Sequence, residues 1–326
     1  MISVVIPARN EDYLQQTIDS LLDNAREAVE IIVVLDGYWP VPPLKSNKQV
    51  HILHRSKPLG MQHGVNSAAR MASGKYLMKV DAHCLFSKDW DVILKNDCEE
   101  NWLVTLPRYS LDVEKWERKP NRLPVSYNTL TFPYTHDNQF GTGFHGKKWT
   151  DGNLGYKSYY GREMRRKDVL IDDVIAIQGS LWFMHRQYFF DLDGQDEYHS
   201  NFFQEPQEMV FKVWLSGGRC VVNKKAWYAH WHKNKGSGYG WSMGQKKETE
   251  RFSTWIWMND KWPKQTRKFK WLIDKFLPMA GWPEDWESYI KDETEPFRIF
   301  DAKGNDGYKI ESNKSSDLHE VSCASG

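Results

Sequence analysis

Asp81 and His83 lie two residues apart, directly after an apolar run at 74–80 that predicts a buried strand. Side chains at this spacing point the same way as an extended chain leaves a strand, so one metal ion could contact both. A carboxylate and an imidazole together suit Mn²⁺, whereas Mg²⁺ prefers oxygen ligands alone. Open α/β sheets also bind ligands at the carboxyl ends of their strands. The pair therefore predicts a metal site; the alternative is a strand-end aspartate beside a surface histidine.

The elements that would position this pair follow from the apolar pattern of the first 80 residues. Apolar runs predict strands at 3–7, 30–35, 50–53 and 74–80, and helical spacing predicts helices at 12–22 and 61–72. This alternation is typical of a mostly parallel sheet buried on both faces. No G-x-G-x-x-G follows the first strand, which disfavours a dinucleotide-binding fold of the dehydrogenase type.

Several blocks of sequence resemble one known family in order and spacing. They are SVVIPARNE from Ser3, EIIVVLDG from Glu30 and the run from Pro58 to Cys84 that ends in D-x-H, followed by QGSLWFM from Gln178, EPQEMVFKVW from Glu205 and AHWHK from Ala229. Together they resemble GT-A glycosyltransferases of family 2, and most closely the related polypeptide N-acetylgalactosaminyltransferases. The resemblance covers roughly residues 1–262 and is weakest between 105 and 170.

The resemblance implies an α/β, Rossmann-like GT-A fold and a division of the chain. Residues 1–262 would form the transferase domain, with a nucleotide-sugar half at 1–104 and an acceptor-side half with a flap at 105–262. Residues 263–309 would form a Trp-rich helical appendage. Residues 310–326 carry few apolar side chains, so we expect a disordered tail.

The resemblance also implies the ligands of the metal and of a UDP-sugar donor. Asp81, His83 and His230 would bind the metal, with His232 as the rival of His230. The donor-binding set would be Pro7, Ala8, Arg9, Asp36, Arg55, Gly60, Met61, Asp81 and Lys233. Within it Asp36 would hold the uracil or ribose, although an Asp-Gly pair is also common in turns. Lys233 would pair with the diphosphate, a role open to Lys235 as well.

On the acceptor side the resemblance implies Gly179, Ser180 and Trp182, but the catalytic base is less clear. Inverting family 2 enzymes place an aspartate where this chain has Pro206. Glu205 and Glu208 remain, three residues apart at the start of a predicted helix and therefore expected on one face. Either one of them is the base of an inverting enzyme, or the enzyme retains configuration as the related enzymes do. We favour retention.

Two further segments carry expectations of their own. The run 233–244 is rich in Gly and Ser and holds Tyr239 and Trp241, which predicts a flap closing over the donor or else an ordinary surface loop. Nine of the sixteen Trp lie between Trp227 and Trp286, and 261–275 holds six basic residues and one acidic residue. A basic and aromatic surface of this kind could bind nucleic acid. The alternative for 261–275 is an amphipathic helix that packs its aromatic side chains on the core. A second basic run, 162–167, adds to the nucleic-acid case and the net charge of +1 subtracts from it.

Apolar runs and cysteines predict where in the cell the protein acts. No run of about 18 apolar residues exists, and Met1 begins directly on a predicted strand, which predicts neither a signal peptide nor a membrane anchor. The four cysteines lack metal-ligand spacing and are expected to be free thiols. We therefore predict a cytoplasmic enzyme of bacterial or viral origin.

The predicted function is metal-dependent transfer of a sugar from a UDP-sugar to a hydroxyl, with Mn²⁺ favoured and Mg²⁺ possible. The acceptor would be a glycan, a protein or a hydroxymethylated pyrimidine in viral DNA. A non-catalytic sugar- or nucleotide-binding module is the alternative, because Pro206 stands in the position of the base.

Overall fold

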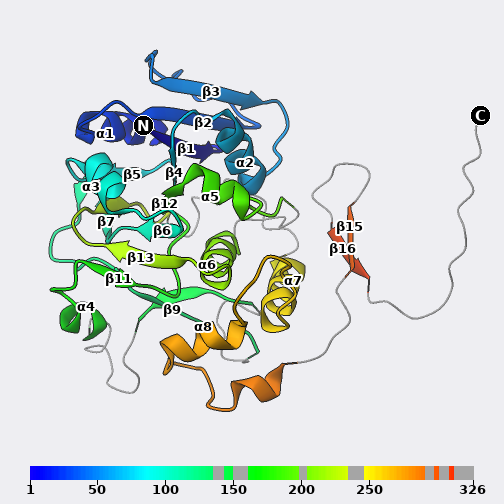
Figure 1. Ribbon diagram of the computed structural model, residues 1–326. Coiled ribbons are helices and arrows are strands. Elements are labelled where there is room, and N and C mark those ends of the chain that lie inside the picture. Colours follow the sequence, from blue (N-terminus) through cyan, green and yellow to red (C-terminus); the bar gives the residue numbers. More distant parts are fainter. Residues whose placement is uncertain are drawn as a thin grey trace, which may run out of the picture.

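The computed structural model describes residues 1–134, 143–149, 161–197, 204–233, 246–290, 297–300 and 308–311. At its centre lies a mixed eight-stranded sheet (Figure 1). In spatial order its strands are β11 (Ile171–Asp173), β13 (Arg219–Asn223), β6 (Trp102–Thr105), β12 (Leu181–His185), β4 (Tyr76–Val80), β1 (Ile2–Ala8), β2 (Glu30–Asp36) and β3 (Val50–Arg55). The four strands from β4 to β3 are parallel, and so are β13 and β6, whereas β12 is antiparallel to both of its neighbours.

Helices cover both faces of this sheet because successive side chains of its strands point to opposite sides. Val4 and Ile6 of β1 pack in one apolar cluster with α1 (Leu14–Asn24) and α3 (Trp90–Asp97). Val5, between them, packs in a second cluster with α2 (Met61–Met71), α5 (Arg186–Asp191) and α6 (Glu205–Leu215). The predicted α/β class is confirmed, and all six strands and helices expected in the first 80 residues are present.

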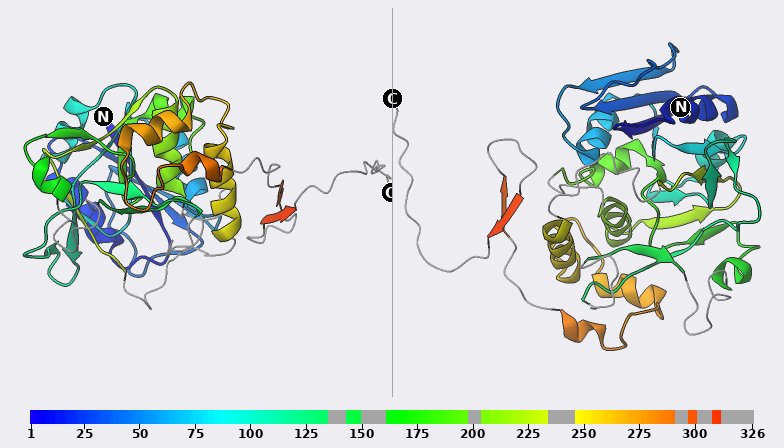
Figure 2. Two further views of the ribbon diagram at one scale, coloured as in Figure 1. Left: turned by 90° about the horizontal axis from the view of Figure 1, so that it is seen from below. Right: turned by 180° about the vertical axis from the view of Figure 1, so that it is seen from behind.

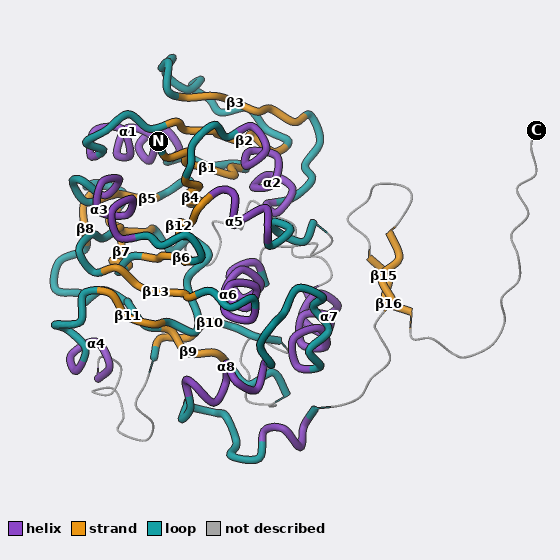
Figure 3. The backbone as a smooth tube through the Cα atoms, viewed as in Figure 1, coloured by secondary structure: helices purple, strands orange, loops and turns teal. Residues whose placement is uncertain are grey.

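A smaller sheet joins segments that are far apart in the sequence. Its order is β5 (Cys84–Phe86), β14 (Tyr228–His230), β7 (Arg108–Asp112) and β8 (Glu117–Arg118), and Figure 3 shows β5, β7 and β8 together at one edge of the molecule. Strand β14 is antiparallel to β5 and pairs His230 with Cys84. A separate hairpin is formed by β9 (Asn128–Leu130) and β10 (Gly146–Lys148).

The C-terminal helices α7 (Lys246–Met258) and α8 (Phe269–Phe276) pack beside α6, at the opposite end of the molecule from β3 (Figures 1 and 2). Buried aromatic side chains hold them there: Trp257, Trp262, Phe269, Phe276, Trp282 and Trp286. A short 3-10 helix, η2 (Trp286–Tyr289), ends this region. The basic, aromatic segment therefore packs as the amphipathic-helix alternative predicts, with its aromatic side chains on the core.

Most basic side chains of this segment have acidic partners. Lys264 lies 2.5 Å from Asp193, Lys270 lies 2.6 Å from Glu287 and Lys275 lies 2.8 Å from Asp173. These ion pairs leave less positive charge for a nucleic-acid backbone than the sequence suggested.

Beyond residue 290 the structure describes one antiparallel pair, β15 (Phe297–Phe300) with β16 (Tyr308–Glu311). Residues 310 and 311 of the predicted tail belong to β16, and 312–326 lie outside the described residues. Of the predicted flap at 233–244 the structure describes Lys233, and 234–244 lie outside the described residues.

We expect Gly218→Ala to destabilise the fold by about 1–3 kcal/mol, the usual cost of overpacking. Gly218 lies between α6 and β13, where a Cβ would meet the carbonyl oxygen of Val213 at 2.9 Å and come closer still to the Asn101 carbonyl and the Tyr188 hydroxyl. Urea unfolding measures the loss. Gly64→Ala is the matched control, because the nearest atom to its Cβ is 3.5 Å away. Equal stability of the two variants would contradict the packing described here.

Candidate functional site

The carboxyl ends of β1 and β4 open onto a cavity of about 350 Å³. The segment before β12 closes it from the side, where the backbone N–H of Asp81 donates to the carbonyl of Ser180 at 3.0 Å. Nine residues predicted from the sequence line this cavity: Pro7, Met61, Asp81, His83, Gly179, Ser180, Glu205, His230 and Lys233. The sheet thus brings together at one place residues that are up to 226 positions apart, from Pro7 to Lys233.

Asp81, His83 and His230 form a cluster that could hold a metal ion. Their ligand atoms all lie within 4.8 Å of one another, and Nε2 of His230 is 3.2 Å from Oδ2 of Asp81. The pairing of β14 with β5 produces this approach, and the N–H of Trp231 donates to the carbonyl of His83 at 3.2 Å. His232 also lines the cavity but is not part of the cluster.

The protonation states of the cluster suit a cation. Burial lowers the pKa of His230 to about 4, so its imidazole is neutral at pH 7, the form that binds metals. Partial burial raises the pKa of Asp81, but Lys79 and then His230 outweigh it and hold that pKa well below its usual range. One carboxylate and two imidazoles make a borderline donor set that fits Mn²⁺.

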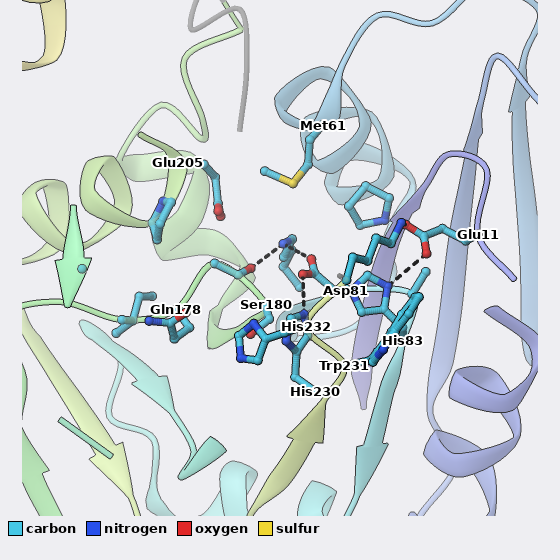
Figure 4. Close-up of a pocket in the computed structure, with 18 of the residues that line it drawn as sticks. Glu11, Met61, Asp81, His83, Gln178, Ser180, Glu205, His230, Trp231 and His232 are labelled. Atoms are coloured by element: carbon cyan, nitrogen blue, oxygen red, sulfur yellow. Dashed lines mark hydrogen bonds and ion pairs between the residues drawn. The ribbon is translucent and has the colours of Figure 1, made fainter. Parts of the chain in front are cut away.

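Glu11 is a site residue that the sequence did not reveal. One of its oxygens lies 3.0 Å from Nδ1 of His83 and the other 2.9 Å from Nζ of Lys233, and the side chain is almost fully buried. A carboxylate on one ring nitrogen of a histidine leaves the other nitrogen free to face a metal and fixes the orientation of the ring. Figure 4 shows Glu11 and His83 together on one side of Asp81.

We expect Glu11→Gln to weaken Mn²⁺ binding about 10- to 100-fold, the usual effect of losing a partner of a metal-binding histidine. Isothermal titration calorimetry with Mn²⁺ measures the change in affinity. Glu114→Gln, an exposed position in the β7–β8 turn, is the control with the same charge change. Unchanged affinity in Glu11→Gln would show that His83 does not depend on this contact.

Lys79 is a second site residue that the sequence did not reveal. It is almost fully buried, its Nζ lies 2.6 Å from Oδ1 of Asp81, and it donates to the carbonyl of Gly179. Burial lowers its pKa, but Asp81 and then Glu205 outweigh this and raise the pKa above its usual value. A single lysine within an otherwise apolar strand, two residues before Asp81, was the available signal.

The two predicted catalytic glutamates do not share a site. Oε1 of Glu205 accepts hydrogen bonds from Trp182 at 2.7 Å and Gln195 at 2.8 Å, and Glu205 lines the cavity. Glu208 instead pairs with Lys212 at 2.6 Å and lines another hollow. Helical geometry sets their side chains about 60° apart around the helix axis. Of the two glutamates only Glu205 lines the cavity, together with Pro206 and Gln207 of the same helix.

Glu205 is a fully buried carboxylate in the wall of the cavity. Its Oε2 has no hydrogen-bond partner among the described residues, and a Cβ at Gly179 would lie 2.7 Å from it. Burial raises the pKa of Glu205 to about 7, against the opposing effect of Lys79. The absence of a side chain at Gly179 therefore gives this carboxylate the room to face the cavity. Trp182, expected on the acceptor side, is fully buried and holds Glu205 from behind.

Other residues expected to contact the donor lie behind the cavity wall. Asp36 is fully buried and accepts hydrogen bonds from the N–H groups of Leu59 and Gly60, at 3.0 and 2.9 Å. Arg55 lies 3.4 Å from Asp36 and donates to the carbonyl of His63 at 2.7 Å. These residues fix the loop that positions Met61, as the turn interpretation of Asp36 anticipated. Ala8 is buried in the core, and Arg9 is half-buried beside it; neither lines the cavity.

Comparison with known proteins gives concordant matches. Residues 3–171 match the family described as Glycosyl transferase family 2. Polypeptide N-acetylgalactosaminyltransferase 5 of Caenorhabditis elegans is 25% identical over 279 residues, which cover 79% of this chain and 41% of that protein. The human Polypeptide N-acetylgalactosaminyltransferase 10 is 26% identical over 236 residues, 67% of this chain and 35% of that protein. The chain thus spans less than half the length of these relatives.

Among solved structures, that of GalNAc-T7 with UDP, GalNAc and Mn²⁺ matches with a TM-score of 0.60 and 15% sequence identity. The match covers 85% of this chain and 56% of that one. It confirms the predicted GT-A fold. Within the described part of the chain, no helix has the length and apolar character needed to cross a membrane.

Proposed function

Since the chain belongs to glycosyl transferase family 2, we propose that it transfers a sugar from a UDP-sugar to an acceptor hydroxyl with the help of a divalent cation, Mn²⁺ in preference to Mg²⁺. One observation carries the proposal: the Asp81, His83 and His230 cluster and the Glu205 carboxylate line the same cavity. A site that only bound a nucleotide would not need a buried carboxylate with a pKa near 7 in the same cavity as a metal-binding cluster.

Asp81, His83 and His230 would hold the cation, which when bound neutralises the diphosphate that leaves the anomeric carbon. Lys79 fixes Asp81 from beneath, and Glu11 fixes His83. Lys233 would turn from Glu11 toward the diphosphate. The UDP and Mn²⁺ named with the GalNAc-T7 structure support this donor and cation.

Pro7 and Met61 would form the apolar wall of the nucleoside pocket, with Asp36, Arg55 and Gly60 shaping the loop behind it. Gly179 and Ser180 would border the acceptor on the opposite side. The transferred sugar would then lie between the metal cluster and Glu205.

We assign the catalytic carboxylate to Glu205 and propose transfer with retention. Pro206 has no group that could remove a proton from an acceptor. A Glu205 carboxylate facing the sugar would stabilise positive charge at the anomeric carbon, and the lack of a base at position 206 favours retention. The anomeric proton coupling of the product, measured by NMR, distinguishes the two stereochemical outcomes.

The acceptor hydroxyl would belong to a glycan, a protein or hydroxymethylated DNA. The ion pairs of Lys264, Lys270 and Lys275 weaken the case that the appendage grips DNA. We also propose a cytoplasmic location, supported by the unpaired thiols of Cys84, Cys98 and Cys220.

The test is release of UDP from a panel of UDP-sugars with Mn²⁺, each with hydroxymethylated DNA, unmodified DNA or no acceptor. We expect slow release without acceptor from one donor and acceleration by the true acceptor. Release specific to hydroxymethylated DNA would identify a DNA-modifying enzyme, and release indifferent to DNA would direct the search to glycans and proteins. No release from any donor would favour the non-catalytic module.

A further inference from the structure

Arg108 is a buried cation that forms no ion pair with any residue in the described part of the chain. Its side chain begins on β7, and the residue is only 7% exposed. One guanidinium N–H donates to Nε2 of His232, and Nε has no hydrogen-bond partner among the residues that the structure describes. No carboxylate of the described residues forms an ion pair with it, and its pKa is lowered by burial. Such a group costs stability unless something pairs with it.

Two further cations lie on the surface near Arg108. Lys148 of β10 and Arg122 lie near enough that Arg108 and Arg122 both help to lower the pKa of Lys148, after burial as the main cause. Both residues are exposed, so the three cations run from the interior to the surface. A fold that needed only packing at this place would not concentrate like charges, because their repulsion is unfavourable.

The cationic group, defined as Arg108, Arg122 and Lys148, borders the proposed acceptor side of the cavity. His232, which Arg108 contacts, lines the cavity, and its ring lies 4.9 Å from that of His230. His145 and Gly146, just before Lys148, line it too. In Figure 4, His232 lies toward Gln178, whereas Glu11 and His83 lie on the other side of Asp81. The donor-side residue Lys233 pairs with Glu11 on that other side.

We propose that the cationic group binds an oxyanion, a phosphate or a carboxylate, that the acceptor carries close to its reacting hydroxyl. The planar fork of a guanidinium pairs with both kinds of oxyanion through two parallel hydrogen bonds. Assignment of this anion to the acceptor depends on the proposed transferase function; its binding to Arg108 does not. The acceptor class is thereby narrowed to phosphorylated or acidic molecules.

Direct binding to metal-free protein tests the site. Isothermal titration, at low salt and without chelator or phosphate buffer, uses three probes: methyl phosphate, dimethyl phosphate and acetate. They stand for a phosphate monoester, a phosphodiester and a carboxylate. We expect at least one probe to bind with one-to-one stoichiometry, and the tightest identifies the source of the anion. No binding of any probe would overturn the proposal.

Arg108→Gln should weaken that binding by at least about tenfold, as expected for loss of a charge-assisted pair. Lys115→Gln, an exposed position on the same β7–β8 segment, removes the same charge and should leave the affinity unchanged. Arg108→Lys keeps the charge without the fork and should bind with intermediate affinity, which keeps the test informative if Arg108→Gln does not fold. Equal loss in the Lys115 control would show general charge attraction only.

Saturating the wild-type protein with Mn²⁺ and UDP before the titration separates the two halves of the cavity. We expect the probe still to bind; displacement by UDP would place the anion on the donor side and overturn the acceptor assignment. Failure of probe binding beside normal UDP release would reject this inference alone. Normal probe binding in a protein that releases no UDP would instead reject the proposed function.

Discussion

Replacing Asp81 by Asn is expected to abolish Mn²⁺-dependent UDP release, a loss of about a thousandfold or more. Asp81 is the only carboxylate of the metal cluster in the part of the chain that the structure describes. An amide is a much weaker ligand than a carboxylate, and the Lewis-acid contribution of a metal is several kcal/mol. The assay is steady-state UDP release with the preferred donor, with and without Mn²⁺.

Asn is preferred to Ala here because Asp81 also neutralises Lys79, at 2.6 Å. Removing the whole side chain would leave a buried cation unpaired and could unfold the protein. The amide oxygen of Asn can still accept a hydrogen bond from Lys79. Asp168→Ala, at an exposed position, is the control. Mn²⁺-dependent turnover near the wild-type rate in Asp81→Asn would contradict the assignment of this cluster as the metal site.

Glu205→Gln is expected to lower turnover about 10²- to 10⁴-fold, the range typical of a lost catalytic carboxyl group. Trp182 and Gln195 hold Glu205, so the amide should keep its place. The drop should therefore appear in kcat, with the Tm at pH 8 no lower than that of the wild-type protein. Glu208→Gln is the contrasting variant, because its buried partner Lys212 predicts a loss of stability instead.

The pH dependence of turnover and of stability gives a second test of the role of Glu205. Its pKa is about 7 in the folded protein, so the carboxyl group is protonated below that value and ionised above it. If the carboxylate is the active form, turnover rises with pH through about 7 and then levels off. Stability has the opposite sign: the proton is held more tightly in the folded state, so this contribution is lost as pH rises from the ordinary value of 4.5 to about 7. Glu205→Gln should flatten both dependences, and an unchanged profile would contradict the role.

The sequence predicted the first 80 residues of the fold well because that part of the chain depends on local patterns. The apolar runs in the first 80 residues became parallel strands, of which β1, β2 and β4 are buried and β3, at the edge of the sheet, is partly exposed. The D-x-H spacing placed Asp81 and His83 beside one cavity. His230 was found only through the family resemblance. Its approach to Asp81 depends on the pairing of β14 with β5, and no local pattern encodes that register.

The residues that the sequence missed share this dependence on long-range contacts. Glu11 meets Lys233 across 222 positions, and Arg108 meets His232 across 124. In the sequence Lys79 is a single polar residue in an apolar strand, and its hydrogen bond to the carbonyl of Gly179 depends on the pairing of β12 with β4. The separation of Glu205 from Glu208 has another reason: helical spacing predicts which side chains are neighbours but not which of them lines a cavity.

The most direct test of the account is a crystal structure with Mn²⁺ and UDP, measured at a wavelength where manganese scatters anomalously. We predict one strong anomalous peak within coordination distance of Asp81, His83 and His230, with the diphosphate on its open side toward Lys233. An anomalous peak elsewhere, or bound UDP without any peak between these three side chains, would contradict the central claim that this cluster is the metal centre of a glycosyltransferase.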